Sequence, residues 1–311
     1  MQTPATAPRR VGFVGLGAMG RPMAARLLGA GHALTVYDAR RAAVDGFVAQ
    51  YGGTAAGSLA EVARRSEAVI TMLPDGNIVR HVVAGEPAGT DGLLYGLAAG
   101  AVLIDMSSSS PTGTQALGNE LAAHGIDMLD APVSGGVTRA EAGTLSIMMG
   151  GAPTVVARWR PLLAPLGGQI FATGPLGSGH ALKALNNLVS AAGLLAAAEA
   201  LLIGRRFGLD PDVMIDVLNA STGRNNSTEN KFRQFVFSRR FASGFALDLM
   251  VKDLATALEL ADATDTPAPF GAACRQLWVS AQTELQAGAD HTAMVQWLER
   301  RAHALLTTAG D

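Results

Sequence analysis

The chain has 311 residues, of which 49% are hydrophobic and 5% aromatic, with 37 glycines and a formal net charge of -2. This length is sufficient for two domains, and the composition is typical of a folded α/β protein rather than a disordered or fibrous one. The near-neutral charge argues against a nucleic-acid partner, and one cysteine without clustered histidines gives no disulfide framework and no metal-ligand spacing, so we predict no bound metal.

The polar first residues, MQTPATAPRR, precede a glycine-rich apolar stretch that is too short for the core of an export signal. The longest apolar run, residues 188–203, contains Glu199 and is shorter than the roughly 20 residues that a membrane helix needs. We therefore expect no membrane association and a cytoplasmic protein.

Short β-branched stretches, each next to a turn signal, recur through the first half of the chain and alternate with helical stretches. They cover residues 10–17, 33–39, 68–74, 101–107, 126–133, 144–151 and 169–174. Strands that alternate with helices predict βαβ units and a mostly parallel sheet.

From about Gly179 the strand signals stop. An Ala/Leu-rich run continues to Gly204, and helical patterns follow at residues 211–221 and 245–263 and in two further segments. We predict a Rossmann-type α/β domain over residues 9–176 and an all-helical domain over residues 177–311, linked by one long helix.

A phosphate-binding turn is predicted directly after the first strand, where Gly15-Leu16-Gly17-Ala18-Met19-Gly20 matches GxGxxG. The first glycine permits a tight turn, the second lets backbone N–H groups approach a pyrophosphate, and the third allows close packing of helix on strand. Asp38 ends the next strand and is expected to accept hydrogen bonds from a ribose hydroxyl, which favours NAD over NADP. Arg40 and Arg41 lie beside it and leave NADP open.

Two later motifs combine turn glycines and polar side chains. Ser134-Gly135-Gly136 follows a strand and offers a hydroxyl and unshielded backbone N–H groups for a small carboxylate, or is a simple tight turn. Lys183 opens an apolar helix, with Asn187 one turn later on the same face. Partial burial would lower the pKa of Lys183 and suit it to acid/base work, although a lysine at a helix start also commonly reaches out to solvent.

The motifs together resemble one family, the β-hydroxyacid dehydrogenases, which include 3-hydroxyisobutyrate dehydrogenase and tartronate semialdehyde reductase. The matching segments span nearly the whole chain: FVGLGAMGRPMA at 13–24, DMSSSSP at 105–111, DAPVSGGVTRAEAGTLSIMMGG at 130–151, GSGHALKALNN at 177–187 and KDL at 252–254. The resemblance implies a Rossmann-type domain, a helical substrate domain and an active-site cleft between them.

The resemblance also implies a role for individual residues. Lys183 matches the catalytic lysine, Asn187 the asparagine that helps to hold the substrate, and Ser134 to Gly136 the carboxylate-binding turn. Leu73, Pro74 and Lys252 match residues beside the cofactor. Ser108 is also expected there, although it stands where the family commonly has threonine. From the residues alone, Lys252 would be a solvated helix charge.

Other readings remain open. One is an imine reductase-like enzyme, but such enzymes usually lack the lysine that Lys183 matches. Another is 6-phosphogluconate dehydrogenase, whose pattern carries a histidine after that lysine that is missing here. A third is a non-catalytic assembly protein, which would bind the cofactor without turnover. The polar loop at 221–231 supplies Arg224, Asn225 and Asn226 either for a second polar group of a substrate or as a solvated loop in which Ser227 or Thr228 caps a helix. The apolar helical half suits a homodimer or homotetramer.

Overall fold

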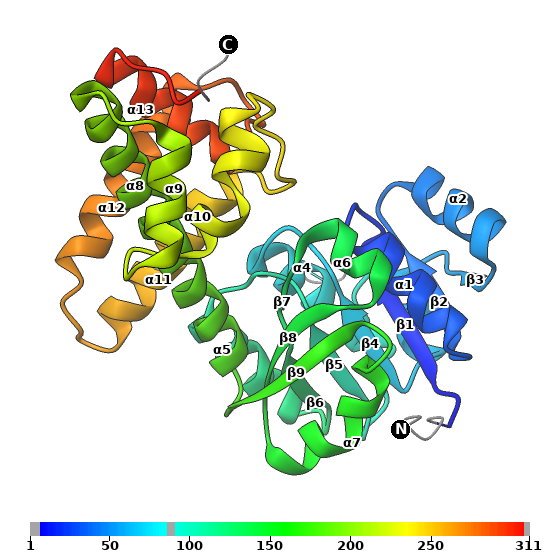
Figure 1. Cartoon of the computed structure of the whole chain (residues 1–311). Helices are drawn as coiled ribbons and strands as arrows, with labels where there is room; N and C mark the ends of the chain where they lie inside the picture. Colours follow the sequence, from blue (N-terminus) through cyan, green and yellow to red (C-terminus); the bar gives the residue numbers. More distant parts are fainter. Residues whose placement is uncertain (1–6, 86–90, 308–311) are drawn as a thin grey trace. The chain divides into compact units, whose positions relative to one another are not determined.

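A computed structural model of the chain describes residues 7–85 and 91–307 (Figure 1). The stretch that bears on an export signal includes residues 1–6, which lie outside the described residues. The chain forms two compact units, Met1–Lys183 and Ala184–Asp311. The division falls within the long helix α8 (Ser178–Phe207), which begins in the first unit and continues through the second.

The first unit contains a nine-stranded sheet and its covering helices. The strands are β1 (Arg10–Val14), β2 (Ala33–Tyr37), β3 (Thr54–Ala55), β4 (Ala68–Thr71), β5 (Val102–Asp105), β6 (Asp127–Asp130), β7 (Val133–Ser134), β8 (Leu145–Gly150) and β9 (Gly167–Gly174). The helices are α1 (Gly20–Gly29), α2 (Arg41–Tyr51), α3 (Leu59–Arg64), α4 (Gly76–Ala84), η1 (Leu93–Tyr95), α5 (Pro111–Ala122), α6 (Gly136–Ala142) and α7 (Pro153–Leu163).

The sheet has the order β3-β2-β1-β4-β5-β6-β8-β7, and β9 pairs with β8. Strands β1 to β6 run parallel to one another, whereas β8 is antiparallel to β6 and β7 and parallel to β9. Because β1 lies between β2 and β4, the chain reverses its direction across the sheet at this point. Ligands of open α/β sheets bind at such a reversal, beyond the carboxyl ends of the strands.

Alternating strand residues fill two separate cores, one on each face of the sheet. Val11 and Phe13 of β1 pack with apolar residues of α1, α2, α6 and α7. Val14 belongs to the other core, with residues of α3, α4 and α5. Near-continuous burial of strands on both faces is the physical reason why the parallel strands are so rich in Val, Ile and Leu.

The second unit is helical and packs around the buried part of α8. Its other elements are α9 (Pro211–Ala220), α10 (Asn226–Asn230), the π-helical segment η2 (Phe232–Phe237), α11 (Leu247–Ala263), α12 (Pro269–Glu284), η3 (His291–Ala293) and α13 (Met294–Ala302). Leu194 and Leu201 of α8, Phe232 of η2 and Trp278 of α12 are fully buried in one core. Burial of such residues stabilises the unit by about 1.5–3 kcal/mol for each large apolar side chain.

By length and composition, α8 is apolar enough to cross a membrane, and half of its most apolar window is buried inside the protein. The apolar run predicted at residues 188–203 is shorter than the helix, because α8 also includes the more polar residues on both sides of that run. A core helix passes the same test, and the buried leucines of α8 have that role here.

The predicted fold class is confirmed, including the mostly parallel sheet, the helical second half and the long helix. All seven predicted strands form, but the stretch at 126–133 contains two strands, β6 and β7. Pro132 separates them, because proline has no N–H to donate to a sheet ladder. The two-residue strand β3 has no apolar run in the sequence and was not predicted.

Candidate functional site

The glycine turn after β1 has the conformation that its motif requires. Gly15 has φ +100°, and a Cβ there would collide with the carbonyl oxygen of Met72. A Cβ on Gly20 would collide with the carbonyl oxygen of Gly15, whereas a Cβ on Gly17 would have no heavy atom within 4 Å. Gly15 and Gly20 are therefore needed for the fold, while Gly17 leaves open space for a ligand.

Asp38, directly after β2, is fixed against this turn. Its Oδ2 accepts a hydrogen bond from the backbone N–H of Leu16 at 2.8 Å, and its Oδ1 accepts one from the N–H of Arg40 at 2.9 Å. Both neighbouring guanidinium groups have a carboxylate partner, Arg40 with Asp38 at 3.4 Å and Arg41 with Asp45 at 2.9 Å. The turn and the acid thus fit a dinucleotide with a free ribose hydroxyl.

The loops after β4 and β5 are tied together by a buried carboxylate. Asp105 is fully buried and accepts hydrogen bonds from Thr71 Oγ1 at 2.9 Å and from Ser109 Oγ at 2.7 Å. Ser107 Oγ in turn accepts from the backbone N–H of Leu73 at 2.9 Å. The predicted cofactor-side residues Pro74 and Ser108 lie in these two loops, at the carboxyl edge of the sheet.

Ser134 ends β7, and the two glycines that follow lead into α6. Gly135 has φ +137° and Gly136 has φ +70°, a region in which side chains other than glycine are strained. A Cβ on Gly136 would have no heavy atom within 4 Å. The turn therefore presents backbone next to open space, as a carboxylate-binding turn needs.

The start of α8, which carries Lys183, is anchored to the end of β6. Asp130 is fully buried; its Oδ1 accepts a hydrogen bond from the N–H of Gly177 at 2.8 Å, and its Oδ2 accepts one from the N–H of His180 at 2.7 Å. A carboxylate that accepts the first N–H groups of a helix satisfies them and complements the helix dipole. Lys183 follows His180 by three residues and is partly buried.

His180 strengthens this anchor and was not predicted as a site residue. Its ring is buried, with Nδ1 at 2.8 Å from Thr114 Oγ1 and Nε2 at 3.7 Å from Asp105 Oδ2. The imidazole thus lies between the carboxylates of Asp105 and Asp130. The sequence signal that could have revealed this cluster is an aspartate at the end of each of two buried strands, Asp105 in β5 and Asp130 in β6.

In the second unit, Asn187 of α8 faces α11. Its Nδ2 donates a hydrogen bond to Asp253 Oδ2 at 2.5 Å, and both side chains are buried. Lys252 Nζ lies 3.4 Å from Asp253 Oδ1, and the Lys252 side chain is only 28% exposed. Lys252 is therefore not the solvated helix charge that its sequence position alone suggested, and Asp253 orients both neighbours.

The polar loop before η2 has largely structural roles. Asn225 caps α10 by accepting hydrogen bonds from the N–H groups of Ser227 and Thr228, and Thr228 Oγ1 completes a capping box. Arg224 forms an ion pair with Glu229 at 3.7 Å, with 64% of its side chain exposed. Predicting Ser227 or Thr228 as the cap was wrong, because Asn225 precedes both and has the extended backbone of a cap residue.

Lys231, at the end of this loop, is partly buried and was not predicted. Its Nζ donates a hydrogen bond to Ser190 Oγ of α8 at 3.3 Å. Burial lowers the pKa of Lys231 to about 8, against the effect of the Asp290 carboxylate. Burial, together with the Lys231 charge, lowers the pKa of His291 to about 4, so this imidazole is neutral near pH 7.

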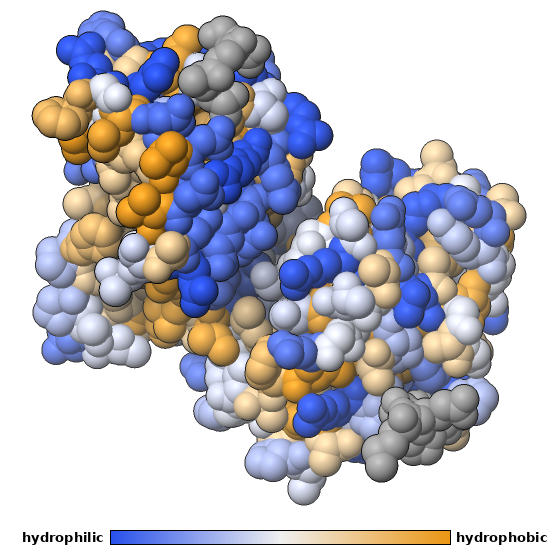
Figure 2. Space-filling model, viewed as in Figure 1, coloured by the Kyte–Doolittle hydropathy of each residue, from blue (hydrophilic) through white to orange (hydrophobic). Residues whose placement is uncertain are grey.

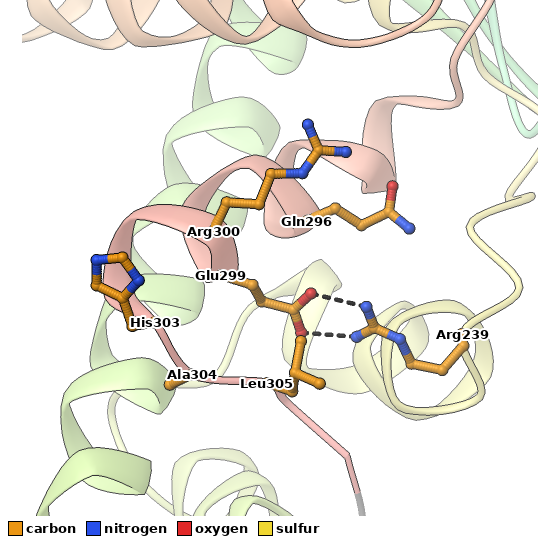
Figure 3. A pocket seen from close by; sticks show the side chains of 7 residues that line it. All are labelled: Arg239, Gln296, Glu299, Arg300, His303, Ala304 and Leu305. Carbon is orange, nitrogen blue, oxygen red and sulfur yellow. Dashed lines mark hydrogen bonds and ion pairs between the residues drawn. The ribbon is translucent and has the colours of Figure 1, made fainter.

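A cavity of about 450 Å³ lies elsewhere in the second unit, beside α13 (Figure 3). Arg239 and the buried Glu299 form two hydrogen bonds across it, at 2.6 and 2.8 Å, and the N–H of Leu306 also donates to Glu299. This ion pair ties the turn after η2 to α13 and gives the cavity a structural role. Residues 7–85 and 91–307 contain no group of three or more His, Cys, Asp or Glu side chains that could hold a metal ion.

Comparison with known proteins places both halves of the chain. Residues 10–174 match a family described as the NAD binding domain of 6-phosphogluconate dehydrogenase, and residues 177–298 match one described as NAD-binding of NADP-dependent 3-hydroxyisobutyrate dehydrogenase.

Similar proteins match over nearly their whole length. The 2-(hydroxymethyl)glutarate dehydrogenase of Eubacterium barkeri is 41% identical over 86% of this chain and 88% of its own. The 3-hydroxyisobutyrate dehydrogenase of Pseudomonas aeruginosa is 40% identical over 90% and 94%. The structure of Mycobacterium tuberculosis 3-hydroxyisobutyrate dehydrogenase with L-serine has a TM-score of 0.85 at 33% identity, covering 94% of this chain and 99% of that one. The chain therefore belongs to the β-hydroxyacid dehydrogenase family and is an NAD(P)-dependent dehydrogenase.

Proposed function

We propose that the protein interconverts a small β-hydroxy acid and its carbonyl product, with Lys183 as general acid/base and without a metal. The substrate is a small β-hydroxy acid that resembles 3-hydroxyisobutyrate, or one that resembles D-glycerate with a product like tartronate semialdehyde. The observation that carries this proposal is the anchoring of α8 by Asp130, which holds the turn before Lys183 at the carboxyl edge of the sheet.

In the oxidative direction, neutral Lys183 takes the proton of the substrate hydroxyl while the carbinol carbon gives up a hydride. In the reverse direction, protonated Lys183 donates that proton to the carbonyl oxygen. When bound, the nicotinamide supplies the hydride acceptor or donor. Proton transfer by a positioned group of this kind accelerates a reaction by about 10²- to 10⁴-fold.

The other residues bind and orient. We propose that Ser134, Gly135 and Gly136 hold the substrate carboxylate and that Asn187, oriented by Asp253, also contacts the substrate. Gly15 to Gly20, Asp38, Leu73, Pro74, Ser108 and Lys252 are proposed to hold the cofactor. Orientation of both reactants is a large part of the rate enhancement of a hydride transfer.

The screen that tests this function offers NAD and NADP with 3-hydroxyisobutyrate, D-glycerate, L-serine and 2-(hydroxymethyl)glutarate, and follows formation of the reduced cofactor. We expect turnover of at least one of these acids. Cofactor binding without any turnover would favour the assembly protein, and reduction of imines alone would favour an imine reductase-like enzyme.

We expect NAD to be preferred, because the Asp38 carboxylate repels a ribose 2′-phosphate and accepts hydrogen bonds from a 2′-hydroxyl. Replacing Asp38 by glycine should therefore shift the ratio of kcat/KM values from NAD toward NADP. The ratio is measured with both cofactors at one substrate concentration. An unchanged ratio would contradict the role of Asp38.

Gly17 and Gly20 provide a matched pair of substitutions. Gly17→Ala places a methyl group in open space, so the fold should persist while Kd for NAD rises, by about tenfold for each 1.4 kcal/mol of lost contact. Gly20→Ala should instead destabilise the first unit, because its Cβ collides with backbone. Calorimetric titration with NAD and urea unfolding separate the two effects. Equal NAD affinity in Gly17→Ala would show that no ligand approaches this turn.

A cytoplasmic location and a homodimer or homotetramer are also proposed. Ile203 and Phe207 of α8, and Val213 and Val217 of α9, are between 58% and 84% exposed, and Figure 2 shows apolar side chains gathered over α9. Exposed apolar side chains in adjoining positions commonly mark an interface. Light scattering during gel filtration measures the mass that tests this.

A further inference from the structure

The chain contains three lysines, Lys183, Lys231 and Lys252. Its other basic side chains, apart from histidine, are all arginine. Each of the three lysines is partly buried, and the proposed function already uses two of them. Lys231 is therefore a partly buried lysine to which the proposed function gives no role, and its burial does not suit a lysine that only faces solvent.

The ammonium of Lys231 forms no ion pair at contact distance with any residue that the structure describes, and the Asp290 carboxylate acts on it only from further away. Within the described ranges, 7–85 and 91–307, no carboxylate oxygen lies within 4.0 Å of its Nζ. Lys252 has Asp253 at 3.4 Å, and the buried Glu299 has Arg239 at 2.6 Å. A partly buried charge is costly unless it is paired. The Ser190 hydroxyl occupies one of the three donor positions of the ammonium, so two remain for an anion.

Lys231 lies close to the proposed substrate residue Asn187. Ser190, which accepts the Lys231 hydrogen bond, follows Asn187 by three residues, a rise of about 4.5 Å along the helix and on the same face. Asn225 Nδ2 donates to the carbonyl oxygen of Gly193, one turn further along α8, at 3.4 Å. Helix α10 thus runs beside α8 and brings Lys231 back toward Asn187.

The position of Lys231 is held from both sides. The capping box of Asn225 and Thr228 fixes the chain before it, and the fully buried Phe232 fixes the chain after it. His291 is only 4% exposed, and its Nε2 has no hydrogen-bond partner among the described residues. The charge of Lys231 also lowers the pKa of His291, and both side chains have unused hydrogen-bonding capacity.

We propose that Lys231 binds a second carboxylate of the substrate, and that the enzyme therefore prefers hydroxy acids that carry two carboxylates. This inference rests on the proposed function, in which Asn187 contacts the substrate. The first carboxylate is the one that every β-hydroxy acid has. The second carboxylate binds to the ammonium of Lys231, beside the Ser190 hydroxyl, and this contact favours diacids over monoacids.

The test compares binding of glutarate, a dicarboxylate, with binding of butyrate, a monocarboxylate of similar length, to the full chain by calorimetry. Lys231→Met should weaken glutarate binding by about 10- to 100-fold, as expected for the loss of a hydrogen bond between charged groups. Butyrate binding should stay within about twofold. Lys231→Arg, which keeps the charge, should retain most of the preference for glutarate.

Arg224→Ala is the matched control, since it removes a positive charge from the same loop at an exposed position. It should leave the ratio of glutarate to butyrate affinity unchanged. Thermal unfolding of each variant confirms that it is folded. A wild-type chain that does not prefer glutarate, or a folded Lys231→Met variant with an unchanged ratio, overturns the proposal.

The ratio should also fall as the pH rises through about 8, where Lys231 loses its proton. The groups that act on it are Ser190 of α8, Asp290, which caps η3, and His291, which is already neutral in this range. Because binding is measured without turnover, this experiment tests the Lys231 inference independently of the proposed dehydrogenase activity. Lys231-dependent glutarate binding without any dehydrogenase activity would support the carboxylate-binding role of Lys231 and overturn the proposed function alone. Turnover with no preference for diacids would overturn this inference alone.

Discussion

Replacing Lys183 by alanine is expected to abolish turnover while NAD still binds. The substitution removes the group that exchanges a proton with the substrate oxygen, and kcat should fall by about 10²- to 10⁴-fold. The glycine turn and Asp38, which are proposed to hold the cofactor, do not depend on this side chain. The measurement is kcat with the best acid of the screen, together with calorimetric titration with NAD.

Lys183→Arg is a useful companion, because it keeps a positive charge that cannot be deprotonated in the working pH range. Lys183→Arg should also lose activity. If Lys183 acted only through its positive charge, arginine would instead restore part of the activity. If Lys183→Ala kept an activity close to that of the wild type, Lys183 would not be the general acid/base.

Replacing Asp130 by alanine should both destabilise the first unit and reduce turnover. The buried carboxylate accepts hydrogen bonds from two backbone N–H groups at the start of α8. Each unsatisfied buried donor costs about 1–3 kcal/mol. Since Lys183 follows on the same helix, a shift of its first turns misplaces the amine, and a displacement of about 1 Å can cost 10²-fold in rate.

Asp127, at the opposite end of β6, supplies the control. It is partly buried, and its side chain makes no hydrogen bond within the described part of the chain. Asp127→Ala should therefore change the urea midpoint much less than Asp130→Ala does. If Asp130→Ala kept both the wild-type midpoint and the wild-type kcat, the anchoring of α8 by this carboxylate would not position Lys183.

The sequence predicted those parts of the fold that depend on local patterns. β-branched stretches between turn signals predicted the strands, and Gly15 to Gly20 were predicted to form a tight turn because their spacing reflects backbone geometry. The antiparallel pairing of β8 was not predicted, because pairing direction depends on contacts between distant segments. Strand β3, with two residues, has too few side chains to produce a pattern.

The candidate site was predictable where a motif carries the chemistry. The residues that orient it, Asp105, Asp130 and His180, are far apart in sequence and meet only in the folded chain. Asp253 was overlooked for the same reason, although it lies inside the KDL motif. Lys231 was not predicted, although the presence of only three lysines in the chain is a sequence signal that could have drawn attention to it.

The most direct test of the central claim is transfer of a labelled hydride. The wild-type chain is incubated with NAD and the best acid of the screen, deuterated at its carbinol carbon, and the reduced cofactor is analysed by mass spectrometry. We expect the deuterium to be recovered in the reduced cofactor, with slower turnover than for the unlabelled acid. Deuterium released into water, or a bound cofactor that no acid of the screen reduces, would contradict a β-hydroxyacid dehydrogenase.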